Sequence, residues 1–136
     1  MKKISVIVFL LLLIVFSIVW FLWNKPFKDI SLSNSFAKLS AVELVKEFDD
    51  NEELATKKYL NQIVEISGTV SATETNDAGV TSVTLEGGGM SGIICELDTK
   101  TTHKRLSFAA GEIVQMKGIC TGKLMDIVLS RCVEIK

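Results

Sequence analysis

The chain has few of the side chains on which catalytic and metal sites are commonly built. Its 136 residues contain one histidine and three cysteines. No Ser-His-Asp spacing is present, and no pair of carboxylates stands in a recognisable acid–base arrangement. The sequence therefore predicts a protein that is not an enzyme and that uses no cofactor.

Cationic residues are also scarce in the part of the chain that follows the first 28 residues. Residues 29–136 contain 11 Lys and Arg against 16 Asp and Glu, a net charge of −5, whereas residues 1–28 hold four lysines and no acid. Proteins that bind nucleic acid nonspecifically do so with clustered cations on one face. Nucleic acid is therefore not the expected partner of this domain.

The histidine and the cysteines do not follow a zinc-binding pattern. Cys95, His103, Cys120 and Cys132 have the spacing C-x7-H-x16-C-x11-C, without a paired C-x2–4-C knuckle, so no metal site is predicted. In an exported domain three cysteines favour one disulfide and one free thiol. We predict Cys120–Cys132 as the pair, because both lie on consecutive strands joined by one turn. Cys95–Cys132 and Cys95–Cys120 remain alternatives.

One long apolar run lies at the start of the chain. Ile4 to Trp23 comprises 20 residues without a charge, about 30 Å of helix and enough to cross a bilayer. A cleaved signal peptide would have a shorter apolar region followed by small residues, whereas this run ends in VWFLWNKP. No cysteine is present there for a lipid anchor. We therefore predict an uncleaved signal anchor over residues 1–28, with Trp20 and Trp23 at the interface.

The charges that flank this run predict its orientation. Lys2, Lys3 and the amino terminus lie on one side, and Lys25 and Lys28, offset by Asp29, lie on the other. The positive-inside bias favours a cytoplasmic N-terminus in the inner (cytoplasmic) membrane. The remainder of the chain is then expected in the periplasm or outside the cell.

Two helices are predicted between the anchor and the strands. Residues 29–39 are serine-rich and are typical of a linker, and residues 40–61 form a helical stalk. Ser40 and Glu43 match the capping box S-x-x-E, followed by apolar residues at helical spacing. Asp50 with Glu53 is expected to cap a second, short helix.

Residues 62–136 are predicted to form a five-stranded barrel. Gly68 lies inside the first strand, where glycine usually marks a bulge or bend. The long segment between strands three and four, residues 98–111, is expected to contain a helix that plugs the barrel. The predicted strands are Ile63–Thr75, Val80–Glu86, Gly92–Leu97, Glu112–Cys120 and Asp126–Ile135.

This order of elements predicts a mainly β fold, a Greek-key OB-fold barrel preceded by helices. The segments NEELATKKYLNQIVEISGTV, VTLEG, IICEL, AAGEIVQMKGICTG and DIVLSRCVEI resemble the tRNA_anti-like family of small bacterial OB-fold proteins. The resemblance covers about Ala41 to Ile135. It implies the OB-fold and a membrane or lipoprotein anchor, and it implies no established activity.

The glycine-rich segment before strand three has two interpretations. Gly87, Gly89 and Gly92 have the spacing G-x-G-x-x-G, with Glu112 twenty residues on, but a dinucleotide site requires that these glycines open a helix. The following IICEL is typical of a strand, so we predict a hairpin turn. The ligand is expected to bind either the barrel face of strands one to three or the loops around Gly87–Gly92 and Thr121–Asp126. The candidate ligand-facing loop residues are Gly87, Gly88, Gly89, Met90, Lys123 and Met125.

The expected function is binding rather than catalysis. Strands two and three contain no aromatic residue on which a base could stack, and His103-Lys104-Arg105 is the one basic cluster, interpreted as a solvated helix face. We therefore predict a noncatalytic binding or assembly module of the cell envelope, whose partner is an envelope protein or small ligand. Single-stranded nucleic-acid binding is the alternative, and a small-ligand carrier or an enzyme is the third hypothesis.

Overall fold

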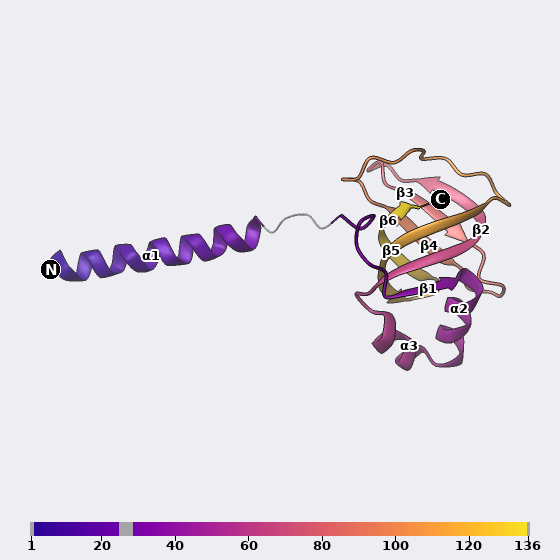
Figure 1. Cartoon of the computed structure of the whole chain (residues 1–136), viewed down its shortest axis with the longest axis horizontal. Coiled ribbons are helices and arrows are strands. Elements are labelled where there is room, and N and C mark those ends of the chain that lie inside the picture. The colour runs from indigo at the N-terminus through magenta and orange to yellow at the C-terminus, as the bar shows by residue number, and fades with distance from the viewer. Residues whose placement is uncertain (1, 25–28, 136) are drawn as a thin grey trace.

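A computed structural model describes residues 2–24 and 29–135 of the chain. The first element, α1 (Lys2–Trp23), is a helix that lies apart from the barrel in Figure 1. Its window Val6–Trp23 has a mean hydropathy of 3.1 and is entirely unburied. This length and composition suit a membrane span, and a signal sequence near the N-terminus meets the same criteria.

The segment expected to be a linker is in large part folded onto the barrel. Ile30 is only 1% exposed, and the chain continues into strand β1 (Ala37–Ser40), which pairs in parallel with residues 64–67. Lys117, itself buried, donates a 3.3 Å hydrogen bond to the Ser31 carbonyl. The serine-rich composition suggested a free tether, but a single isoleucine and a short strand are sufficient to dock it.

Two helices follow, close to the predicted positions. In α2 (Ala41–Asp50) the Ser40 hydroxyl accepts from the Glu43 amide and the Glu43 carboxylate accepts from the Ser40 amide, which confirms the capping box. The second helix, α3 (Glu52–Tyr59), is capped by Asn51 rather than by Asp50, because the Asn51 side chain accepts the Leu54 amide hydrogen bond.

Five strands close into the predicted OB-fold barrel (Figure 1). The third strand of the barrel pairs in parallel with the fifth, and the first pairs with both the second and the fourth, which closes the cylinder. The strands are β2 (Ile63–Thr75), β3 (Thr81–Leu85), β4 (Ile93–Leu97), β5 (Ile113–Lys123) and β6 (Ile127–Glu134).

Gly68 has a different role from the predicted bulge. The register shift of β2 lies between Val70 and Ala72, not at the glycine. A Cβ on Gly68 would lie 2.8 Å from the Ala41 Cβ. Glycine at this position therefore allows the first turn of α2 to approach the barrel.

The predicted helix between strands three and four is absent. Residues 98–111 form turns, bends and coil. Phe108 from this segment is buried, its carbonyl accepts a 3.1 Å hydrogen bond from the Thr73 hydroxyl, and Arg105 lies 4.5 Å above its ring. This segment therefore contributes one buried aromatic ring to the core without forming a helix, and the helical contribution to the same core comes from α2.

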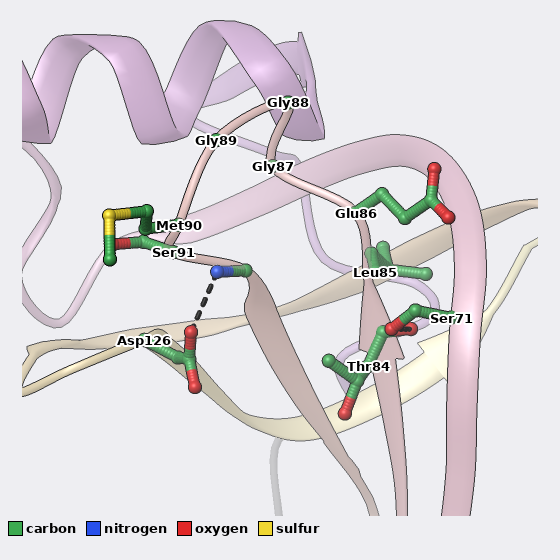
Figure 2. A pocket seen from close by; sticks show the side chains of 11 residues that line it. Ser71, Thr84, Leu85, Glu86, Gly87, Gly88, Gly89, Met90, Ser91 and Asp126 are labelled. Atoms are coloured by element: carbon green, nitrogen blue, oxygen red, sulfur yellow. Dashed lines mark hydrogen bonds between the residues drawn. The ribbon is translucent and has the colours of Figure 1, made fainter.

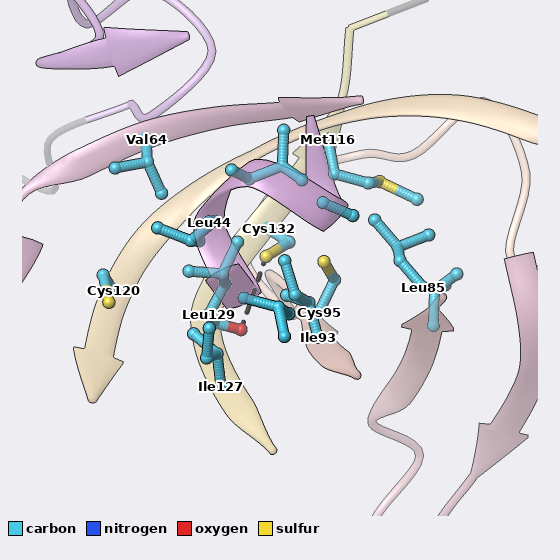
Figure 3. Close-up of a cluster of buried hydrophobic side chains, with 14 of the residues drawn as sticks. Leu44, Val64, Leu85, Ile93, Cys95, Met116, Cys120, Ile127, Leu129 and Cys132 are labelled. Carbon is cyan, nitrogen blue, oxygen red and sulfur yellow. Dashed lines mark hydrogen bonds between the residues drawn. The ribbon is translucent and has the colours of Figure 1, made fainter. Parts of the chain in front are cut away.

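The barrel interior and α2 share one apolar core (Figure 3). Alternate residues of each strand point inward, as in β3, where Thr81, Val83 and Leu85 are buried and the residues between them are half-buried. Leu44 of α2 enters the same cluster from outside the sheet. Cys95, Cys120 and Cys132 are all part of this core, each with 0% exposure.

Candidate functional site

An open groove of about 450 Å³ lies where β3 ends and β4 begins (Figure 2). Its floor is formed by hydroxyl-bearing strand residues, its walls by the glycine-rich loop, and its far rim by an aspartate from the turn between β5 and β6. The groove carries two carboxylates and no cation among its lining residues. These are Ser71, Thr84, Leu85, Glu86, Gly87, Gly88, Gly89, Met90, Ser91, Gly92 and Asp126.

Two of the three consecutive glycines of this loop are needed, for different reasons. A Cβ on Gly87 would overlap the Ser91 carbonyl and lie 2.6 Å from a methyl group of Val45 on α2. Gly88 has a φ of +77°, in the left-handed region that favours glycine. Gly89 has nothing within 4 Å of an added Cβ, so only the first two glycines are dictated by local geometry.

One polar contact joins the loop to the opposite rim of the groove. The Gly92 amide donates a 2.7 Å hydrogen bond to Asp126 Oδ1, and the Ile127 amide donates to the Gly92 carbonyl at 3.0 Å. Two loops that are 34 residues apart in the sequence are thereby held together. The groove is preformed, because its two rims are connected through the protein itself.

The structure brings together four of the six predicted ligand-facing residues. Gly87, Gly88, Gly89 and Met90 line the groove, and the Met90 side chain is fully exposed. Neither of the other two predicted residues lines the groove.

Lys123 pairs with Asp49 of α2, and Met125 is 84% exposed on the turn that follows β5. The polar lining consists of Ser71, Thr84, Glu86 and Asp126. These residues lie within the predicted binding loops or strands, but the sequence did not single them out. Thr84 could have been found from the alternation of β3, because the residues next to inward Val83 and Leu85 must face outward.

The glycine run opens a strand and not a helix. Gly87, Gly89 and Gly92 lead directly into β4, as the sequence predicted. Glu112, which a dinucleotide site would use, is far from the glycine-rich loop in the sequence. Its carboxylate accepts a hydrogen bond from the Ala109 amide and pairs with Arg105. The arrangement offers no helix N-terminus at which a pyrophosphate could be held.

The cysteines, all within the described part of the chain, are free thiols. The predicted pair is not brought together, because Leu129 stands opposite Cys120 in the register of β5 and β6. Cys132 instead contacts Cys95 and donates a 3.4 Å hydrogen bond to the Leu129 carbonyl. Burial raises the pKa of the Cys120 thiol, and burial together with Cys95 raises the pKa of Cys132 well above its usual value. Both therefore remain protonated and act as small hydrophobic residues.

Two of the three residues of the basic cluster after β4, His103 and Arg105, make internal contacts. Arg105 Nη2 lies 2.6 Å from both Glu112 and Glu134, and His103 Nε2 lies 2.6 Å from the Asp98 carbonyl. These residues lie in coil and not on the predicted helix face. Among residues 2–24 and 29–135 no group of three His, Cys, Asp or Glu side chains is placed to hold a metal ion.

The outer faces of β3, β4 and β6 carry few cations. Their exposed or partly exposed residues are Ser82, Thr84, Ile94, Glu96, Val128, Ser130, Arg131 and Glu134. Six cations of residues 29–135 pair with carboxylates. These are Lys38, Lys57, Lys58, Arg105, Lys123 and Arg131.

A closed five-stranded Greek-key cylinder defines an OB-fold protein, and its N-terminal apolar helix has the length and composition of a signal sequence or membrane anchor. The chain belongs to the tRNA_anti-like family, whose sequence profile matches residues 1–134. No curated protein matches the chain. Among solved structures, it is similar to a Klebsiella pneumoniae subsp. pneumoniae MGH 78578 lipoprotein suggested to bind nucleic acid, with a TM-score of 0.60 and 15% identity over 73% of this chain and 91% of that one. At this identity the similarity shows the fold alone.

Proposed function

We propose that the protein is a noncatalytic binding or assembly module of the bacterial cell envelope. Residues 4–23 anchor it by a single span in the inner membrane, with the N-terminus in the cytoplasm and the barrel in the periplasm or outside the cell. The partner is an envelope protein or a small polar ligand, bound at the groove between the glycine-rich loop and Asp126. The observation that supports this site most directly is the bond between Gly92 and Asp126, which fixes both rims before any ligand arrives.

The anchor is supported by the composition of α1 and by its flanking charges. The window Val6–Trp23 contains no charged residue and exposes all its side chains. Exposed apolar side chains are unfavourable in water and favourable in the hydrocarbon core of a bilayer. Lys2 and Lys3 stand on one side without an acid, whereas Asp29 offsets the lysines on the other side. The positive-inside bias then favours export of the barrel.

The chemistry of the groove favours a ligand with hydrogen-bond donors. Glu86 and Asp126 supply carboxylate oxygens, and the hydroxyl groups of Ser71 and Thr84 lie along the floor. The volume of about 450 Å³ is within the usual range for ligand sites, but the groove is open and half polar. An extended protein segment or a small polar molecule fits this shape and charge better than an apolar ligand does.

Single-stranded nucleic acid is the second candidate, because the similar Klebsiella pneumoniae lipoprotein is suggested to bind nucleic acid. Three features argue against it here. Six cations of the domain pair with carboxylates, β3 and β4 lack aromatic residues, and the groove carries Glu86 and Asp126. Retardation of labelled single-stranded DNA and RNA by the detergent-solubilised protein, measured at low and then at rising salt, decides between the two. Absence of a shift at low salt would remove nucleic acid from consideration.

Site-directed photocrosslinking in native membranes tests the proposed groove. A photoreactive residue at Met90, which is fully exposed on the loop, is expected to give a discrete adduct. The same residue at Asp77, at the opposite end of β3, serves as the control position. Glu86→Lys should abolish the Met90 adduct, while Glu74→Lys, a charge reversal on β2 outside the groove, should preserve it. Equal adducts at both positions, or an adduct indifferent to Glu86→Lys, would contradict the proposal.

A further inference from the structure

The docked segment between α1 and β1 sharply limits how far the barrel can move from the membrane. If α1 spans the bilayer, as proposed above, six residues of sequence, 24–29, connect it to Ile30, which is buried in the domain. Six residues span at most about 20 Å when fully extended. Without docking, the free chain would extend from Asn24 to Phe36 and reach about 45 Å.

The docking is built from contacts on the outside of the barrel. Ile30 and Val133 are both buried, yet neither belongs to the main core cluster. Lys117 stands opposite Val133 in the register, is 8% exposed, and donates its hydrogen bond to the Ser31 carbonyl. A separate small cluster on the outer face of β5 and β6 therefore holds the segment in place.

The docked segment and the outer face of β5 each expose one apolar side chain. Leu32 follows the docked isoleucine by two residues and is 85% exposed. Ile113 is 75% exposed and lies four residues before Lys117 on β5, so the two share the outer face of that strand. Exposed aliphatic side chains are unfavourable in water, and here they lie on the face to which the short connection is attached.

We propose that this face, carrying Leu32 and Ile113, lies against the membrane in which α1 is embedded. The lipid interface covers the two side chains, and the docked segment acts as the latch that keeps them there. The inference rests on the proposed anchor. It adds that the barrel has one membrane-facing side rather than rotating freely on a flexible tether.

Spin-label accessibility in proteoliposomes tests the proposal with the full chain. Leu32→Cys and Ile113→Cys introduce labelling sites at exposed positions, whereas the native thiols are buried and the unmodified protein serves as the labelling blank. Oxygen concentrates in lipid, and a polar nickel chelate remains in water. Labels at both positions should show a several-fold higher ratio of oxygen to nickel collisions than a label at Asp77→Cys on the β2–β3 turn.

Two further labels separate the possible outcomes. A label at Val15→Cys in α1 reports the span itself, so a water-like value there would overturn the anchor. A lipid-like value at Val15 with water-like values at Leu32 and Ile113 would overturn only the membrane-facing side. Ile30→Ser, which removes the docking side chain, should lower the Ile113 ratio towards the Asp77 value and leave Val15 unchanged. An unaltered Ile113 ratio in that variant would overturn the role of the latch.

Discussion

The amide of Gly92 and the carboxylate of Asp126 are 2.7 Å apart, and this bond connects the two loops that border the groove. The loop from β3 to β4 contains three consecutive glycines, and such a loop would otherwise sample many conformations. A bond to a carboxylate at its end restricts that freedom. The shape of the groove therefore depends on a contact between residues that are distant in the sequence.

Asp126→Ala is expected to destabilise the barrel by about 1 kcal/mol, since the Gly92 amide loses a charged acceptor in a partly buried position. Asp126→Asn retains an acceptor oxygen and should cost less. Urea denaturation of the two variants and the unmodified protein measures the difference. Equal stability of the alanine variant and the unmodified protein would mean that water replaces the carboxylate without loss.

Gly87→Ala should destabilise the protein by roughly 1–3 kcal/mol, because the new methyl group overlaps the Ser91 carbonyl and a Val45 methyl group. Gly89→Ala is the matched control in the same loop, since an added Cβ there meets nothing within 4 Å. Thermal and urea unfolding of both variants provide the comparison. The loop geometry described above would be contradicted if the two alanine variants were equally stable.

The thiols are expected to be unreactive in the native protein. Cys95, Cys120 and Cys132 are fully buried and free, and burial raises the pKa of the latter two. A maleimide reagent should therefore label none of them in the folded protein and all three after denaturation without reductant. Mass spectrometry counts the labels. A result of one label before reduction and three after it would instead support a disulfide.

Acid should weaken the ion pairs that surround Arg105. The hydrogen bond from Arg105, together with the one from the Ala109 amide, holds the pKa of Glu112 below the ordinary value of 4.5. A lowered folded pKa contributes stability that is present above the unfolded pKa and is lost as the pH falls through the folded value. The unfolding free energy should therefore decrease below pH 4.5, and Glu112→Gln should flatten this dependence. Identical pH profiles for the variant and the unmodified protein would show that this pair contributes nothing, as many exposed pairs do.

The sequence determined the elements whose signals are local. The capping box at Ser40 and Glu43 and the first barrel strand, predicted and observed over Ile63–Thr75, each follow from residues within a few positions. The apolar composition of α1 likewise sufficed to predict a helix long enough to span a membrane.

Only the tertiary structure decided the features that depend on contacts between distant residues. Docking of Ile30 beside Lys117 converts part of a serine-rich linker into a component of the domain, and no local pattern encodes that pairing. Leu129, not Cys132, faces Cys120 because the turn after β5 sets Lys123 opposite Ile127, and from that pair the register places Cys132 beyond Cys120's position. Asp126 reaches the groove through a bond to Gly92. Such contacts are set by packing and register across the whole barrel, which the local chain does not specify.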